Sequence, residues 1–407
     1  MLRPSSAPKR ALSPRGVTAL LAAGTGVSVA NVYYCQPLLR EMAQGFGVPD
    51  ARAGAITTLT QIGTALGMLV LVPMGDLLER RQLASWMCVA SATAGLVMGS
   101  SPSFDMLLVA SFALGVTNNI PHLLLPFAAQ LAPEEERGRV VGTVIGGLLV
   151  GILLSRFIGG FVGGILGWRS VYFMAASVML GLGAALTAFL PKSRVGPERG
   201  SAAASTSTRF AALYSSMARL FRTESELKSA AFSGAALFAA FSAFWTTLVF
   251  LLSTPPYHYG AKAAGLFGLL AAASAAGAPL VGRAMDRYPP RAGVAAGAVL
   301  SLIAFGLLWA FGRSLAGLVV GVVVLDVGVQ AGHVANQTRI YATFPDAKSR
   351  ANTVYMVNYF IGGAAGSALS SRAWAIYAWP GVCVVGLSSA ALACVFALGG
   401  RSPRPAV

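Results

Sequence analysis

The chain has 407 residues, of which 56% are hydrophobic and only 11% are charged, so it is far more apolar than an average soluble domain. Its formal charge of +16 would suit a nucleic-acid partner if the basic residues formed a patch, but Lys and Arg fall in short clusters between apolar runs, which disfavours that class. The four cysteines lie in or beside apolar runs without the spacing of a zinc or redox site, and we expect no metal and no cofactor.

Twelve apolar runs follow one another along the chain, and each is close to the roughly 20 residues that cross a bilayer. The predicted spans are 17–38, 53–74, 82–101, 105–131, 140–163, 169–190, 228–253, 263–283, 292–311, 315–342, 351–372 and 380–399. The pattern predicts an all-α membrane protein with 12 transmembrane helices in two six-helix bundles.

The predicted spans also set the domain boundaries. We expect a cytoplasmic tail at 1–16, an N-terminal bundle at 17–190, a cytoplasmic linker at 191–227, a C-terminal bundle at 228–399 and a cytoplasmic tail at 400–407. The basic tail followed by an apolar run is also typical of a secretory signal, but the recurrence of such runs favours an uncleaved first helix. Residues 210–220 of the linker are amphipathic, and we expect them to lie on the membrane surface as a helix.

Basic residues mark the orientation of the chain. Of the 30 Lys and Arg residues, 23 fall in or beside the segments that are cytoplasmic if both termini are inside, 6 fall at the opposite side, and Arg156 lies within the fifth span. The positive-inside rule therefore predicts cytoplasmic termini. Because the chain is rich in Ala, Gly and Arg, which is typical of a GC-rich bacterium, we expect a multi-pass protein of a bacterial inner membrane in contact with its lipids.

Two features recur in both halves. Gly115 and Gly328 each stand 22 residues before an arginine, Arg137 and Arg350. The loop after the second span and the loop after the eighth each carry an Asp followed by arginines: Asp76, Arg80 and Arg81, then Asp286, Arg287 and Arg291. Repeated halves are typical of transporters that work by alternating access.

These loops resemble those of the major facilitator superfamily, and within it the bacterial drug and sugar efflux members. The family's loop reads G-x-x-x-D-R-x-G-R-R; Asp76, Arg80 and Arg81 keep their places while Val72, Leu77 and Glu79 depart, and the second copy keeps Gly282, Asp286, Arg287 and Arg291. An Asp at a helix end can bind the loop arginines and the next helix N-terminus, and so act as a conformational latch. The simpler alternative, ordinary positive-inside topology, explains the arginines but not the paired aspartates.

The fifth span resembles the family's antiporter motif, G-x8-G-x3-G-P-x2-G-G. Gly142, Gly151, Gly159 and Gly160 keep the frame, while Ser155 and Arg156 replace the central Gly-Pro. We expect the glycines to allow close helix packing whatever the function. The altered centre weakens the inference of antiport.

Two charges are expected inside the membrane. Arg156 would cost about 3 kcal/mol in hydrocarbon without a partner or a wet cavity. Asp326 begins a polar stripe on the tenth span that continues with Gln330, His333 and Gln337 at helical spacing. We expect this stripe to face the bundle interior, either as part of a cavity or as buried polar contacts between helices.

Other polar residues fall on helices that line the central cavity in the family. These are Asn31, Tyr34, Asn118, His122, Trp245, Asn352, Tyr355 and Tyr359. With Arg156, Gln330 and Gln337 they predict an amphipathic cavity for a small-molecule substrate. No P-loop pattern is present, so an ion gradient is the expected energy source, with Asp326, Arg156 and His333 as the proton-coupling groups.

The resemblance implies a secondary transporter, with proton-coupled efflux of a small amphipathic solute or drug as the first hypothesis. Proton-coupled uptake of a metabolite, or a transport-inactive sensor on the same fold, remain alternatives. A membrane-embedded enzyme is disfavoured because H-E-x-x-H and G-x-S-x-G are absent and the chain has 3 histidines. We expect a monomer.

Overall fold

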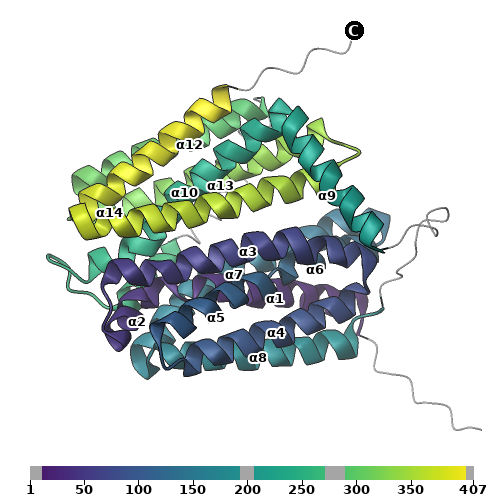
Figure 1. The fold of residues 1–407 in the computed structure, drawn as a ribbon, viewed down its shortest axis with the longest axis horizontal. Coiled ribbons are helices and arrows are strands. Elements are labelled where there is room, and N and C mark those ends of the chain that lie inside the picture. The colour runs from purple at the N-terminus through teal and green to yellow at the C-terminus, as the bar shows by residue number, and fades with distance from the viewer. Residues whose placement is uncertain (1–11, 193–205, 271–288, 400–407) are drawn as a thin grey trace, which may run out of the picture.

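The computed structural model describes residues 12–192, 206–270 and 289–399, apart from the side chains of Asp76, Leu77 and residues 206–209. In these ranges the regular secondary structure is helical throughout. Figure 1 shows two bundles lying against each other, with the N-terminal half running from purple to teal and the C-terminal half from teal through green to yellow. The predicted all-helical membrane fold is confirmed.

The N-terminal half contains eight α-helices and two short 3-10 helices in its described residues. They are α1 (Pro14–Tyr33), η1 (Gln36–Leu38), α2 (Leu39–Phe46), α3 (Asp50–Leu77), α4 (Arg80–Ser100), α5 (Phe104–Thr117), α6 (Ile120–Leu131), η2 (Glu134–Glu136), α7 (Arg137–Leu166) and α8 (Trp168–Phe189). The predicted first span bends at η1, where Pro37 cannot donate a backbone hydrogen bond. The predicted fourth span breaks into α5 and α6 at Asn118 and Asn119, just before Pro121.

The C-terminal half follows the linker. Its described helices are α9 (Thr206–Thr223), α10 (Ser225–Leu252), Ala261–Leu270, α12 (Pro290–Phe311), α13 (Leu315–Thr343) and α14 (Lys348–Leu398). Helix α14 contains a sharp kink at Ala378, where φ is 51°, two residues before Pro380, so this long helix holds the two spans predicted at 351–372 and 380–399. The second part of the predicted span 263–283 lies outside the described residues.

Ten helices of the described ranges are long and apolar enough to cross a membrane, and the helix Ala261–Leu270 is a shorter apolar one. We call the end of the bundles that carries loops 101–103 and 312–314 the outer end, following the charge prediction. The opposite end, with residues 133–136 and 344–347, is the inner end. At the outer end one apolar cluster joins the halves, including Leu38 and Phe104 of the first and Phe250 and Trp379 of the second.

The inner end is organised differently. Within the described residues, one apolar cluster there belongs to the N-terminal half and a smaller one to the C-terminal half. A third cluster joins the halves along α3, with Ala65 and Met68 packed against α10 and α14. The halves therefore share a broad contact at the outer end and a narrower one along α3 and α14 toward the inner end.

Helix α9 lies where residues 210–220 were expected to form a surface helix. It is a helix, but it packs against protein at the inner end of both halves, as Figure 1 shows at the right of the view. The Tyr214 hydroxyl donates to the Leu69 carbonyl of α3 at 3.1 Å, and Met217 is buried in the cluster with α14. The linker helix therefore contacts the two halves together.

Candidate functional site

Arg156 is fully buried in α7, at 1% exposure, and aromatic rings surround its guanidinium. Its Cζ lies 3.9 Å from the ring centroid of Trp245, 4.9 Å from that of Tyr33 and 5.4 Å from that of Phe241. Its Nε donates to Gln36 Oε1 at 2.7 Å. Neither Nη1 nor Nη2 has a hydrogen-bond partner in the described part of the chain. Aromatic rings thus cover the faces of the guanidinium and Gln36 accepts from Nε, while the N–H donors of the two terminal nitrogens have no acceptor in the described ranges.

Asp326 of α13 is also buried, at 7% exposure. Its Oδ1 accepts a hydrogen bond from Trp245 Nε1 at 3.2 Å, and its Oδ2 has no partner among the described residues. The ion pairs found in the described ranges do not join Asp326 to Arg156. One indole therefore contacts both charges, the cation at its face and the carboxylate at its N–H.

Four residues form what we call the central polar site: Gln36, Arg156, Trp245 and Asp326. The first two belong to the N-terminal half and the last two to the C-terminal half, so the site lies where the halves meet. The sequence indicated Arg156, Trp245 and Asp326 but missed Gln36, Tyr33 and Phe241. Gln36 had a usable signal, since an uncharged polar residue beside a proline within an apolar span is uncommon enough to suggest a buried hydrogen bond.

The remaining stripe residues of α13 are only partly buried. His333 Nδ1 shares a hydrogen bond with the Tyr355 hydroxyl at 2.9 Å, and its ring centroid lies 4.7 Å from that of Tyr359. Tyr359 in turn stacks on Phe238 at 4.1 Å. Since residue numbers on α13 rise from the outer to the inner end, Gln330, His333 and Gln337 continue from Asp326 toward the inner end. The stripe is thus most accessible on the inner side of Asp326.

Two candidate cavity residues of the N-terminal half are hydrogen-bonded to each other. Asn31 Nδ2 donates to Asn118 Oδ1 at 3.3 Å, and Asn118 Nδ2 donates to the Ser28 carbonyl at 2.5 Å. The two asparagines thus satisfy each other at the break between α5 and α6, which is a structural use of their amides. Tyr34 is buried beside Gly159, while His122 is half-buried. On α14, Asn352 has a buried Oδ1 without a partner in the described ranges.

Part of the predicted conformational latch falls outside the described residues. Gly282, Asp286 and Arg287 lie outside the described residues, as does the side chain of Asp76. Arg80 Nε donates to the Gly75 carbonyl at 3.0 Å. Arg81 Nη1 donates to the Leu190 carbonyl at 3.1 Å, where it meets the carboxyl end of α8. The described contacts of both arginines lie within the N-terminal half.

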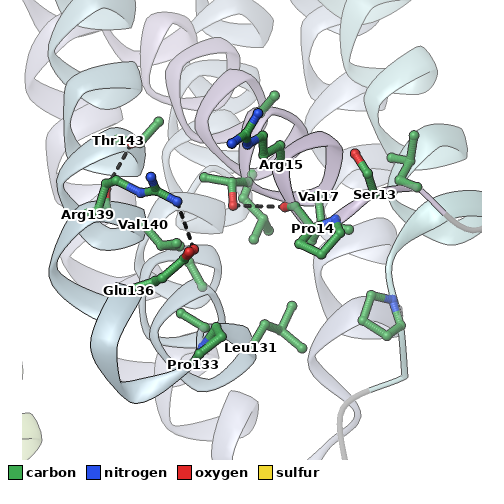
Figure 2. Close-up of a pocket in the computed structure, with 17 residues that line it drawn as sticks. Ser13, Pro14, Arg15, Val17, Leu131, Pro133, Glu136, Arg139, Val140 and Thr143 are labelled. Atoms are coloured by element: carbon green, nitrogen blue, oxygen red, sulfur yellow. Dashed lines mark hydrogen bonds and ion pairs between the residues drawn. The ribbon is translucent and has the colours of Figure 1, made fainter.

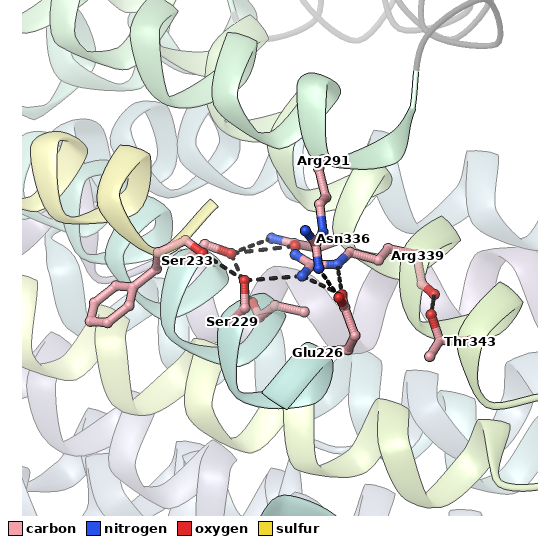
Figure 3. A network of polar contacts seen from close by, with 9 residues as sticks. Glu226, Ser229, Ser233, Arg291, Asn336, Arg339 and Thr343 are labelled. Carbon is pink, nitrogen blue, oxygen red and sulfur yellow. Dashed lines mark hydrogen bonds and ion pairs between the residues drawn. The ribbon is translucent and has the colours of Figure 1, made fainter. Parts of the chain in front are cut away.

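Arg291 joins an ion network at the inner end of the C-terminal half (Figure 3). Its guanidinium pairs with Glu226 of α10, and Arg339 of α13 pairs with the other oxygen of that carboxylate. Arg339 Nε lies 2.6 Å from Glu226 Oε2, and Arg339 Nη2 donates to Ser229 Oγ at 3.1 Å. Sequence reasoning missed Glu226 and Arg339 because both lie near span ends, where charge is expected anyway. The network ties together α10, α12 and α13.

The glycines of α7 differ in their surroundings. A Cβ at Gly151 would overlap the backbone of α1 at Gly26, and one at Gly159 would lie 2.9 Å from the Tyr34 carbonyl oxygen. A Cβ at Gly160 would meet the helix Ala261–Leu270 of the other half. At Gly142, by contrast, no atom of the described residues lies within 4 Å of an added Cβ, and the packing role expected there stays a prediction. This position is exposed near the inner end of α7.

Cavities of the described residues do not mark the site directly. A pocket of about 900 Å³ opens at the inner end between α1, α6 and α7, where Arg139 pairs with Glu136 at 2.8 Å (Figure 2). It contains neither buried charge of the central polar site. A narrow crevice does reach Arg156 between Gln36, Trp245 and Ala264, but it leaves no room for a water molecule. The central polar site is therefore closed along this crevice.

Comparison with known proteins agrees with this architecture. The family model described as Major Facilitator Superfamily matches residues 21–367. The "Uncharacterized transporter YgaY" of Escherichia coli O157:H7 is 38% identical over 383 residues, covering 94% of this chain and 95% of that protein. A bacterial homologue of the human lysosomal transporter Spinster, solved in an inward-facing and unoccupied conformation, superposes with a TM-score of 0.70 at 16% identity, covering 97% of this chain and 95% of the other. The nucleoside transporter NupG, in a mutant form, superposes with a TM-score of 0.74 at 13% identity, covering 94% and 98%. The chain therefore belongs to the major facilitator superfamily of membrane transporters.

Proposed function

We propose that the protein is a proton-coupled secondary transporter that exports a small amphipathic solute by alternating access. The observation that carries the proposal is the buried carboxyl of Asp326, which has one oxygen bound to Trp245 and one without a partner in the described ranges. A buried carboxyl with a vacant oxygen can gain or lose a proton with little rearrangement. Because Asp326 lies where the two halves meet, a proton on its carboxyl can affect both halves.

The proposed coupling rests on charge. Ionised Asp326 attracts Arg156 across Trp245 and so favours close approach of the two halves, whereas protonated Asp326 does not. A ligand or proton shifts a two-state equilibrium only if it interacts differently with the two states, and this attraction supplies such a difference. His333 lies on the same helix face, toward the inner end, where it would relay protons between Asp326 and the inner side.

The packing of the halves supports alternating access. The broad apolar contact at the outer end and the partly exposed polar stripe toward the inner end correspond to a state closed outside. One solved relative of similar fold is described as inward-facing, and we infer the same general state here. We also propose that the protein is a monomer of the bacterial inner membrane with both termini in the cytoplasm, as its basic loops indicate.

Export is favoured by the glycine frame of the antiporter motif on α7, which Gly142, Gly151, Gly159 and Gly160 keep. Uptake with a proton is the second candidate, and the observation that favours it is Arg156, which stands where the antiporter motif has proline. The sign of an imposed pH gradient separates the two in membrane vesicles, because antiport accumulates solute when the lumen is acidic and symport accumulates it when the outside is acidic.

The test begins with a substrate found by comparing deletion and overexpression strains across a panel of toxic compounds and metabolites. Purified protein and its Asp326→Asn variant are then placed in proteoliposomes with an imposed pH gradient. We expect the variant to lose accumulation of the solute against its gradient while it still exchanges labelled for unlabelled solute. Glu136→Gln, at an exposed acid, is the matched control.

Two results would overturn the proposal. Accumulation by Asp326→Asn equal to that of the parent would remove Asp326 as the proton carrier. Failure of the parent itself to exchange any solute of the panel would instead favour a sensor on the same fold.

A further inference from the structure

We infer that the transported solute is an organic anion whose carboxylate binds Arg156 while its apolar body lies against the neighbouring rings. The inference deepens the proposed function, since it assigns a substrate class to the same site. It rests on a different observation from the proton coupling, namely the unsatisfied edge of the Arg156 guanidinium.

A guanidinium has two kinds of surface. Its faces accept contact with aromatic rings, and its edge carries five N–H donors that need acceptors in the plane. At Arg156 the rings of Trp245, Tyr33 and Phe241 lie close to the guanidinium. On the edge, Gln36 accepts from Nε only, so the donors of Nη1 and Nη2 remain buried without an acceptor in the described ranges.

Burying unsatisfied charged donors is unfavourable, so these donors call for a partner, and a bound ligand would supply one. The two terminal nitrogens form a planar fork, and a carboxylate matches that fork with two parallel hydrogen bonds. A neutral amide or alcohol matches it less well, and an ammonium group would be repelled. The chemistry of the vacant edge therefore selects an anion.

Another arginine of this chain shows what a purely structural cation looks like. Arg169 of α8 also stacks on an indole, with its Cζ 4.4 Å from the Trp168 ring centroid. Its Nη1 donates to the carbonyls of Gly99 at 3.0 Å and Ser101 at 2.9 Å. Backbone carbonyls thus satisfy one terminal nitrogen of Arg169, whereas in the described ranges none does so for either terminal nitrogen of Arg156.

The rival explanation is that the vacant donors belong to Asp326 in another conformation, without any anionic solute. The aromatic surroundings favour an added ligand, because the half-buried ring of Phe241 beside Arg156 offers apolar area that a carboxylate side chain alone would not use. An aromatic or alkyl carboxylate would use both surfaces. The two explanations give different binding preferences, which can be measured.

The experiment measures equilibrium binding to the purified full-length protein in detergent, without any proton gradient. Three probes share one apolar body: naphthoate, naphthamide and naphthylmethylammonium. We expect naphthoate to bind about tenfold to a hundredfold more tightly than naphthamide, as for hydrogen bonds to a charged group, and the ammonium compound to bind most weakly. A panel in which naphthoate binds no better than the amide overturns the inference.

Variants of the two arginines show which side chain causes the preference for naphthoate over naphthamide. Arg156→Lys keeps the charge but not the fork, so we expect it to lose about tenfold in naphthoate affinity and little in naphthamide affinity. Arg156→Gln should bind the two probes alike, and Arg169→Lys should keep the parental preference. If Arg156→Lys retained the full preference, the fork would not be the binding group. The comparison of probes on the parent protein holds even if a variant fails to fold.

Asp326→Asn tests the rival. We expect this variant to keep the preference for naphthoate, because its Arg156 fork is intact. A preference that exists only in Asp326→Asn, and not in the parent, would show that Asp326 occupies the fork and would overturn the inference. Because binding needs no gradient, these results are independent of whether Asp326 carries the proton.

Discussion

Gly160 of α7 offers a direct test of how the two halves close at the outer end. A Cβ at this position would lie 2.8 Å from Gly265 Cα and closer still to the Ala261 carbonyl oxygen, both in the opposite half. Ordinary contact begins at 3.4 Å, so Gly160→Ala forces the helices apart there by about 0.6 Å or more. Overpacking of this kind typically costs about 1–3 kcal/mol.

That cost applies only to the state in which the helices touch. Alanine also stabilises a helix by about 1 kcal/mol relative to glycine. Because α7 is helical both in the state closed at the outer end and in the open one, this gain does not change the equilibrium between the two states. A difference of 1–3 kcal/mol corresponds to a shift of about 5-fold to 150-fold in the population ratio. We therefore expect Gly160→Ala to move the protein strongly toward states that are open at the outer end.

The measurement is the distance between spin labels attached to cysteines introduced at Pro102 and Arg313, which are exposed on the outer loops of the two halves. The four native cysteines are replaced by alanine in a background that retains transport. We expect a longer distance in Gly160→Ala and no change in Gly142→Ala, which lies near the inner end and whose added Cβ meets none of the described residues within 4 Å. Identical distance distributions for the two variants would refute the account of the outer contact.

Two further predictions concern the buried charges. Trp245→Phe keeps a ring over Arg156 but removes the N–H that stabilises ionised Asp326, so protonation becomes easier and the pH of half-maximal transport should rise by about one unit. Trp379→Phe, which removes an N–H bond to the Leu308 carbonyl instead, is the control, and an equal change in both variants would count against the assignment. Glu226→Ala leaves Arg339 buried without its carboxylate, and thermal unfolding in detergent should show a loss of about 3–5 kcal/mol. Glu136→Ala breaks only an exposed pair and should cost less than about 1 kcal/mol, so similar losses in the two variants would contradict this reading.

The sequence alone was enough to predict the fold class and the two buried charges. A bilayer demands long apolar runs, so the spans can be read locally, and even the kink that splits α14 is marked by Pro380. The same demand makes Arg156 and Asp326 conspicuous, because a charge within such a run is costly. These features can be predicted because they depend only on residues close together in the sequence and on the apolar character of the bilayer.

What surrounds those charges was decided by tertiary packing. Arg156 and its acceptor Gln36 are 120 residues apart, and Trp245 and Asp326 are 81 apart. Whether a helix face meets a neighbour depends on how the helix is rotated and placed, so Gly160 contacts the other half while Gly142 on the same helix contacts none of the described residues. Likewise Asn31 and Asn118 satisfy each other although both were expected in the cavity. Periodicity shows which residues share a helix face, but only the packing of the helices determines what that face touches.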